Sequence, residues 1–153
     1  MSIPKVNDTP YISGNGPPFL PLESGQYKFV LRRFEWRQGH QSQGFWATVR
    51  ILESNHAAVK VGTDASILFQ TGLTDQTQQQ YRMTDLKNFL GALYGEDPRT
   101  INADKKIQEI ISLGESLEEL GMMGHAIARE RTIKKGPKTG QLTANFTYVH
   151  AAA

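Results

Sequence analysis

Aromatic and arginine residues share one face of a segment in the first third of the chain. Apolar and polar residues alternate from Phe45 to Ser54, which predicts an extended strand. Trp46, Thr48 and Arg50 then lie on the face opposite the apolar residues. An exposed indole can stack on a flat ring, and a guanidinium group can bind an oxyanion such as phosphate. The alternative is that a loop or the N-terminal segment covers Trp46, which would make it a structural residue.

A lysine-rich segment near the C-terminus is the second place where binding chemistry is expected. Lys134, Lys135 and Lys138 lie in a segment that also contains two glycines and a proline. The flanking residues have the composition of strands, so we predict a hairpin with this segment at its tip. Lysines at such a tip either keep an exposed strand edge from pairing or bind a phosphate backbone. The tip alone does not decide between these two roles.

Basic and acidic residues are segregated along the chain. Residues 26–50 and 125–150 each contain five Lys or Arg and one acidic residue, whereas residues 96–119 contain three basic and seven acidic residues. This segregation favours a negatively charged partner for the predicted strands. The candidate stacking residues are Phe34, Trp36, Trp46 and Tyr148. The candidate phosphate ligands are Arg32, Arg37, Arg50, Arg129, Arg131, Lys134, Lys135 and Lys138.

Nothing in the sequence has the spacing of a catalytic, metal or cofactor site. The chain has no cysteine, and its four histidines are scattered without the spacing of metal ligands. The segment Gly136–Gly140 lacks the four-residue spacer that precedes Gly-Lys in a phosphate-binding loop. We therefore expect no enzyme activity, no metal and no cofactor. Because there is no apolar run of about 20 residues and no signal pattern, we also expect a cytoplasmic protein with no membrane partner.

Strands flank a helical insertion in the predicted order of elements. Residues 1–24 contain five prolines, which predicts an extended Pro/Gly-rich N-terminal arm, and residues 25–150 are predicted to form one domain. The alternation slips at Arg32 and Arg33, which predicts a bulge or sharp bend in the first strand. The expected strands are residues 25–36, 45–54 and 65–72, followed after the helices by the hairpin within residues 124–150.

The middle of the chain is predicted to be helical. Thr84 is the candidate cap of a helix that ends near Gly95, and the glutamine-rich residues 73–80 are predicted to be a connector. Further helices are expected at residues 102–113 and 116–120. The predicted core positions of these helices are Leu86, Phe89, Leu90, Leu93, Ile107, Ile110, Ile111, Leu117 and Leu120. Three strands, helices and two strands in this order favour a small antiparallel barrel.

Several stretches carry a resemblance to a known family. They are Gly25–Tyr27, Phe45–Ile51, Asp85–Leu90 and the hairpin segment Lys134–Gly140 before Phe146 and Tyr148. In their order, residues 25–150 resemble the OB-fold single-stranded DNA-binding proteins encoded by tailed bacteriophages. The resemblance implies a mainly β fold, a five-stranded antiparallel OB-fold barrel with helices between strands 3 and 4. It also implies sequence-nonspecific binding of single-stranded DNA in the infected bacterial cell, together with replication or recombination proteins.

A second interpretation is an OB-like protein-interaction module. A fold does not fix a function, and the basic strands would also fit an acidic partner protein. Double-stranded DNA is a weaker expectation, because no helix has the basic pattern of a recognition helix. A homodimer is compatible with either interpretation.

Overall fold

The structure is a computed structural model that describes residues 5–9, 25–39, 43–55, 59–132 and 142–149. For residues 126–132 and 142–149 it describes the backbone alone. The described elements are β1 (Gly25–Gln38), β2 (Gln43–Ser54), β3 (Asp64–Thr71), α1 (Gln76–Tyr94), α2 (Ala103–Leu113), α3 (Ser116–Leu120), β4 (Met123–Thr132) and β5 (Leu142–Val149).

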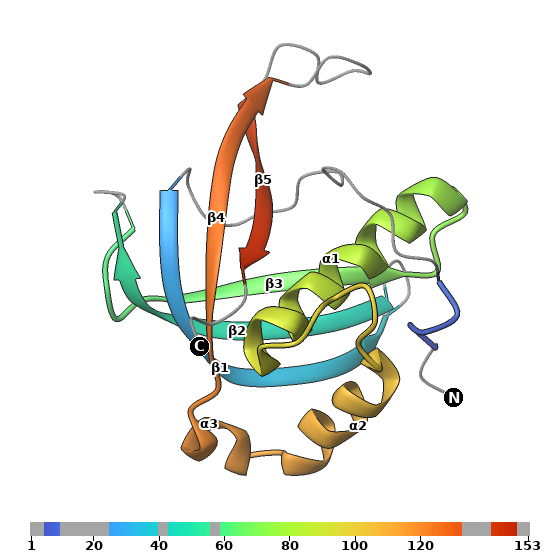
Figure 1. The fold of residues 1–153 in the computed structure, drawn as a ribbon, viewed down its shortest axis with the longest axis horizontal. Coiled ribbons are helices and arrows are strands. Elements are labelled where there is room, and N and C mark those ends of the chain that lie inside the picture. The colour runs from blue at the N-terminus through green and yellow to red at the C-terminus, as the bar shows by residue number, and fades with distance from the viewer. Residues whose placement is uncertain (1–4, 10–24, 40–42, 56–58, 133–141, 150–153) are drawn as a thin grey trace.

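The strands form one antiparallel sheet in the order β3-β2-β1-β4-β5 (Figure 1). The long strand β1 curves through the molecule and pairs with β2 on one side and with β4 on the other. A mainly β, antiparallel fold with helices between β3 and β4 is therefore confirmed. The sheet is open, since no pairing within the described residues joins β3 to β5. The closed barrel stays a prediction.

Strands β4 and β5 continue past the rest of the sheet as a two-stranded ribbon. Gly25 at the start of β1 pairs with Ala128, whereas residues 129–132 of β4 pair, among the described residues, with β5 alone. Figure 1 shows the ribbon projecting beyond the start of β1. The strands of the predicted closing hairpin are thus confirmed. Its lysine-containing tip, residues 133–141, lies outside the described residues.

Strand β1 contains a bulge at Arg32, as the slip in alternation predicted. Leu31 pairs with Val49 and Arg33 pairs with Thr48, so Arg32 is the extra residue. Leu31 is fully buried on the core side, and Phe34 returns to the core after the bulge. The bulge therefore reverses the two faces of β1, and Arg33 points away from the core.

The hydrophobic core lies between the sheet and α1, which crosses it in Figure 1. Phe89 of α1 stacks on Phe29 of β1 with ring centroids 5.6 Å apart, and its centroid lies 5.3 Å from that of Phe69 in β3. Aromatic pairs at these separations are favourable beyond the area that they bury. The predicted apolar stripe of Leu86, Phe89, Leu90 and Leu93 is buried, which confirms it.

Helix α1 begins well before the predicted cap at Thr84. The carboxylate of Asp75 accepts hydrogen bonds from the backbone N–H groups of Thr77 and Gln78, at 2.9 and 3.2 Å, and caps the helix. Thr84 is instead a buried residue within the helix. The predicted connector is wrong for residues 76–80, which belong to α1 because glutamine is a good helix former, whereas residues 73–75 precede the helix. Among the described residues, no helix has the length and apolar character needed to cross a membrane.

The two shorter helices lie largely where they were predicted. Asn102 caps α2 by accepting a hydrogen bond from the N–H of Lys105 at 3.2 Å. Leu117 of α3 is buried, as predicted, but Leu120 is 60% exposed. The prediction for Leu120 is wrong because α3 is a short helix that ends there, and Gly121 adopts a left-handed conformation that redirects the chain.

Part of the N-terminal arm docks on the helices. Val6 is fully buried, and its backbone N–H donates to the carboxylate of Asp104 at 2.7 Å. The side-chain oxygen of Asn7 accepts hydrogen bonds from the first N–H groups of α2. Lys87 of α1 donates to the carbonyl of Thr9. This part of the arm therefore belongs to the folded core, and the rest of the arm lies outside the described residues.

Candidate functional site

The face of the sheet opposite the core carries most of the charged side chains of β1, β2 and β3. We call it the outer face. Strand pairing arranges its residues in rows that follow one another from the base of the ribbon toward the far end of β1. The rows are His125, Lys28 and Glu53; then Met123, Val30, Arg50 and Asp64; then Arg33, Thr48 and Ser66; then Glu35, Trp46 and Leu68; then Arg37, Gly44 and Gln70.

Trp46 lies on the outer face, as predicted. Its chain neighbours Phe45 and Ala47 are fully buried, whereas Trp46 is partly exposed. The guanidinium carbon of Arg37 lies 5.5 Å from the centre of the indole, within the range of a cation–π contact. Arg37 also pairs with Glu35 at 2.7 Å, which holds it beside the ring. The described part of the N-terminal arm lies on the helices, so it does not cover Trp46.

Besides Arg37, two more of the predicted phosphate ligands are held by carboxylates. The Nη1 atom of Arg32 lies 2.7 Å from Asp64, and its Nη2 atom lies 2.5 Å from Glu118 of α3. The Nε atom of Arg50 lies 3.1 Å from the same Asp64. We call these four residues the Asp64 network. Sequence reasoning did not find it, because the carboxylates come from other elements.

The charges of the Asp64 network stabilise one another at a partly exposed position. Although desolvation raises the pKa of Asp64, the hydrogen bonds from Arg50 and Arg32 outweigh it and lower the pKa. The hydrogen bond to Glu118 is the main reason why the pKa of Arg32 is raised. Ion pairs at such positions contribute little to stability and exchange with dissolved ions. A phosphate that reaches these arginines therefore competes with Asp64 and Glu118.

Phe34 and Trp36 face the core, which corrects their choice as exposed stacking residues. Phe34 is 5% exposed, and its ring stacks on Phe45 with centroids 5.8 Å apart. The Trp36 ring lies 5.0 Å from the same phenylalanine and packs against the core cluster. The bulge at Arg32 is the physical reason, because it returns the aromatic residues of β1 to the core side.

The remaining predicted residues belong to the ribbon. Arg129 and Arg131 lie in the part of β4 that pairs with β5 and with no other described strand, and Tyr148 pairs with Ala126 nearer the sheet. Their side chains lie outside the described ones. The same holds for the three lysines of the tip, Lys134, Lys135 and Lys138. The contribution of these six residues to binding stays a prediction.

Three residues of basic type on the outer face were not among the predicted binding residues. They are Arg33, Lys28 and His125. Arg33 is exposed, and its side chain forms no ion pair within the described part of the chain. The bulge was the signal that could have identified it, because Arg33 joins the outer face only if Arg32 is the extra residue. Lys28 and His125 are cross-strand neighbours, which the sequence does not indicate.

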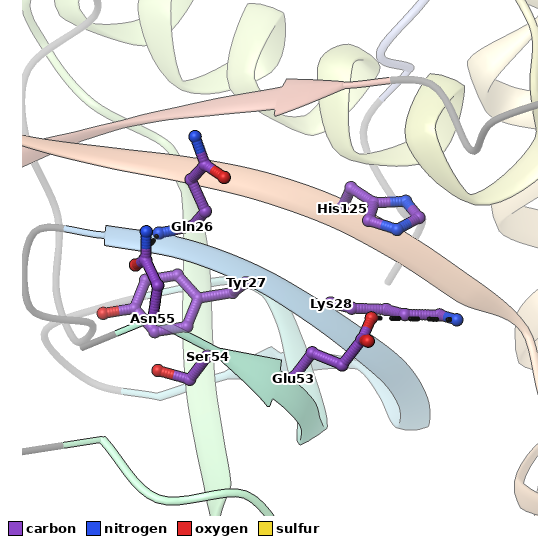
Figure 2. Close-up of a pocket in the computed structure, with 7 residues that line it drawn as sticks. All are labelled: Gln26, Tyr27, Lys28, Glu53, Ser54, Asn55 and His125. Carbon is purple, nitrogen blue, oxygen red and sulfur yellow. Dashed lines mark hydrogen bonds and ion pairs between the residues drawn. The ribbon is translucent and has the colours of Figure 1, made fainter. Parts of the chain in front are cut away.

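The described residues line a pocket and a groove next to the outer face. A pocket of about 300 Å³ opens where the outer face meets the ribbon, and Figure 2 shows its lining residues from β1, β2 and β4. A larger groove of about 810 Å³ lies between the bulge of β1 and α3. Its lining has two guanidinium groups, those of Arg32 and Arg33, against four carboxylates, those of Glu35, Glu115, Glu118 and Glu119, so this groove does not favour an anionic ligand.

A strongly perturbed carboxyl group lies in the core rather than on the outer face. Asp85 of α1 is 6% exposed, and desolvation raises its pKa to about 7 although Arg82 acts in the opposite direction. Desolvation also lowers the pKa of Lys87. Within the described residues, no three His, Asp or Glu side chains gather where they could hold a metal ion. The charged groups of α1 therefore bear on stability, and the outer face is the candidate binding surface.

The arrangement of the outer face suits a flexible, negatively charged chain with flat groups. Trp46 provides a ring beside a cation, and further cations follow it along one continuous face. Comparisons of the chain with protein-family models, with curated proteins and with solved structures found no match.

Proposed function

We propose that the protein binds single-stranded DNA without sequence preference, across the outer face and along the β4–β5 ribbon. The observation that carries this proposal is the position of Trp46, partly exposed beside Arg37 on the face that also holds Arg33, Arg50 and Lys28. A groove of cations with aromatic rings is the common feature of sequence-tolerant single-strand binding. The ribbon, with two arginines in its strands and three lysines at its tip, would extend that surface.

We further propose that this sheet has the topology of an OB-fold and closes into its five-stranded barrel. The strand order β3-β2-β1-β4-β5 is that of the fold, and only contact between β3 and β5 would be needed to close it. Helix α1 packs against β3, β4 and β5, so it bridges the two edges of the sheet. The order of elements and the resemblance to phage proteins support a role in protecting single-stranded DNA during replication, recombination or repair.

Stacking and phosphate contacts would divide the binding energy. A base stacked on Trp46 contributes about 1–3 kcal/mol, and any of the four bases can stack. Each phosphate that a cation neutralises adds about 0.7 to the steepness of the salt dependence on a single strand. Neither interaction reads the edge of a base, so the binding would tolerate any sequence.

The two tryptophans allow a direct test by fluorescence. Trp36 packs against Phe45 and Trp46 lies on the outer face, so each can be replaced by Phe to leave the other as the only reporter. We expect oligo-dT to quench the fluorescence of Trp36→Phe, which retains Trp46, and to leave that of Trp46→Phe nearly unchanged. Circular dichroism of both variants controls for folding.

A polarisation panel then separates the partner classes. Labelled single-stranded DNA, duplex DNA and RNA are compared at two salt concentrations, with heparin as a competing polyanion. Tight binding of the single strand that weakens steeply with salt supports the proposal. Absence of both quenching and binding at low salt would overturn it. Competition by heparin without any binding of oligo-dT would instead favour an acidic partner protein, the alternative that the same cations allow.

A further inference from the structure

The pocket at the base of the ribbon combines groups that bind phosphate with groups that bind a base (Figure 2). Lys28 of β1 and His125 of β4 are cross-strand neighbours and lie on one side of it. Gln26 and Asn55 carry side-chain amides on the other side. We infer that this pocket is a subsite for one nucleotide of a bound single strand, and this inference rests on the proposed function.

The ammonium group of Lys28 is only weakly neutralised. The Nζ atom of Lys28 lies 3.9 Å from the carboxylate of Glu53, which is longer than a hydrogen bond. The Glu53 side chain is 72% exposed, so it can rotate into solvent when an anion approaches. Lys28 can therefore exchange this contact for a phosphate at small cost, unlike the arginines of the Asp64 network. An imidazole next to it adds a second donor for the same phosphate.

The side-chain amide of Asn55 is held by the backbone of Gln26. The N–H of Gln26 donates to the side-chain oxygen of Asn55 at 2.7 Å, and the N–H of Asn55 donates to the carbonyl of Gln26 at 3.2 Å. These two bonds fix Asn55 just after the end of β2, and its side-chain NH₂ group has no acceptor among the described residues. Because an amide can both donate and accept, this side of the pocket can meet the edge of any base.

The position of the pocket gives it a place on the path of the strand. It lies in the row of His125 and Lys28, between the Trp46 end of the outer face and the residues of β4 that continue into the ribbon. A strand that stacks on Trp46 and follows the ribbon has to cross this row. The volume of about 300 Å³ is at the lower end of ligand pockets, which fits a single nucleotide rather than a longer segment.

The test compares three alanine variants of the full chain: Lys28→Ala, His125→Ala and the control Lys105→Ala. Lys105 is an exposed residue of α2, so its loss changes the net charge equally at a position off the outer face. For oligo-dT we expect Lys28→Ala to lower the slope of log K against log salt by about 0.7 and to raise Kd roughly 5-fold at 0.1 M salt. His125→Ala should raise Kd as well, and Lys105→Ala should leave both quantities unchanged.

A second measurement uses the unmodified protein and a mononucleotide. In a titration with dTMP, we expect the NMR signals of the His125 ring to shift, and inorganic phosphate at the same concentration to shift them less. If oligo-dT binds but Lys28→Ala and His125→Ala both behave like Lys105→Ala, the subsite is overturned and the proposed function stands. If the unmodified protein does not bind oligo-dT at all, the proposed function itself fails, which is a different result.

Discussion

Replacing Asp64 with Asn should strengthen, rather than weaken, the binding of single-stranded DNA. Asp64 is the only carboxylate that pairs with Arg50 among the described residues, and it shares Arg32 with Glu118. Asp64→Asn therefore frees Arg50 completely and leaves Arg32 with its second partner. A freed guanidinium that neutralises a phosphate makes the slope of log K against log salt steeper by about 0.7. Between 50 and 200 mM salt, this adds a loss of affinity of about 3-fold.

Two further variants turn this prediction into a series. Glu118→Gln alone should leave the slope nearly unchanged, because Arg32 keeps Asp64 at 2.7 Å. The double variant Asp64→Asn with Glu118→Gln frees both arginines, so it should add about 1.4 to the slope and about 7-fold to the loss of affinity over the same salt range. The control is Glu119→Gln, which makes the same change of charge on α3 at an exposed residue without an ion pair in the described part of the chain.

The assay is fluorescence polarisation of labelled oligo-dT at five salt concentrations, with the thermal midpoint of each variant as a control for folding. The midpoints should change little because the ion pairs are partly exposed. A slope for Asp64→Asn equal to that of Glu119→Gln would show that Arg50 does not reach a phosphate. Weaker binding by Asp64→Asn at 50 mM salt would show that Asp64 positions the arginines instead of competing for them. Either result refutes the reasoning.

Other substitutions separate binding from folding. Trp46→Ala should weaken binding of every DNA sequence alike by about 1–3 kcal/mol in polarisation assays, while denaturation by urea should show little loss of stability; an equal loss of both would show a structural tryptophan. For Asp85, the folded pKa of about 7 exceeds the ordinary value of 3.8, so the folded protein holds a proton that the unfolded chain has lost between these pH values. The free energy of unfolding that Asp85 contributes therefore falls as pH rises through this window, by about 4 kcal/mol at most. Urea denaturation at pH 5 and pH 8 should show this fall in the unmodified protein and not in Asp85→Asn. Val6→Ala removes two carbons from a fully buried position and should lower the free energy of unfolding by about 1.5 kcal/mol, whereas an arm that only tethers would show no change.

The parts of the fold that were predicted from the sequence depend on short-range patterns. The stripe of α1 and the alternation of β2 are set by residues a few positions apart, and each pattern survives in the structure. The bulge at Arg32 was visible for the same reason, since it is a local change of phase. The start of α1 was missed although it is local, because a glutamine-rich segment is compatible with both a connector and a helix. The side chain of Asp75 decides between them by capping the helix.

The contacts that were missed join residues far apart in the sequence. Arg32 meets Glu118 across 86 positions, and the N–H of Val6 meets Asp104 across 98. No periodicity connects such pairs, and the cost in chain entropy of bringing them together depends only weakly on their separation. The N-terminal arm was predicted to be extended because its proline content argues against a sheet. It does not argue against a short segment capping a helix.

The same long-range pairing changes which cations matter for the proposed function. Counting Lys and Arg along the chain favoured Arg32 and Arg50, but Asp64 and Glu118 neutralise both. The outer face is therefore less positive than the sequence count indicates. Arg33 and Lys28 have no carboxylate within hydrogen-bond distance in the described part of the chain, so they should bind a phosphate before the paired arginines do. If Asp64 competes with phosphate for the paired arginines, an increase in salt weakens both the ion pairs within the protein and its contacts with DNA. The slope of log K against log salt then reports only the net number of ions released on binding.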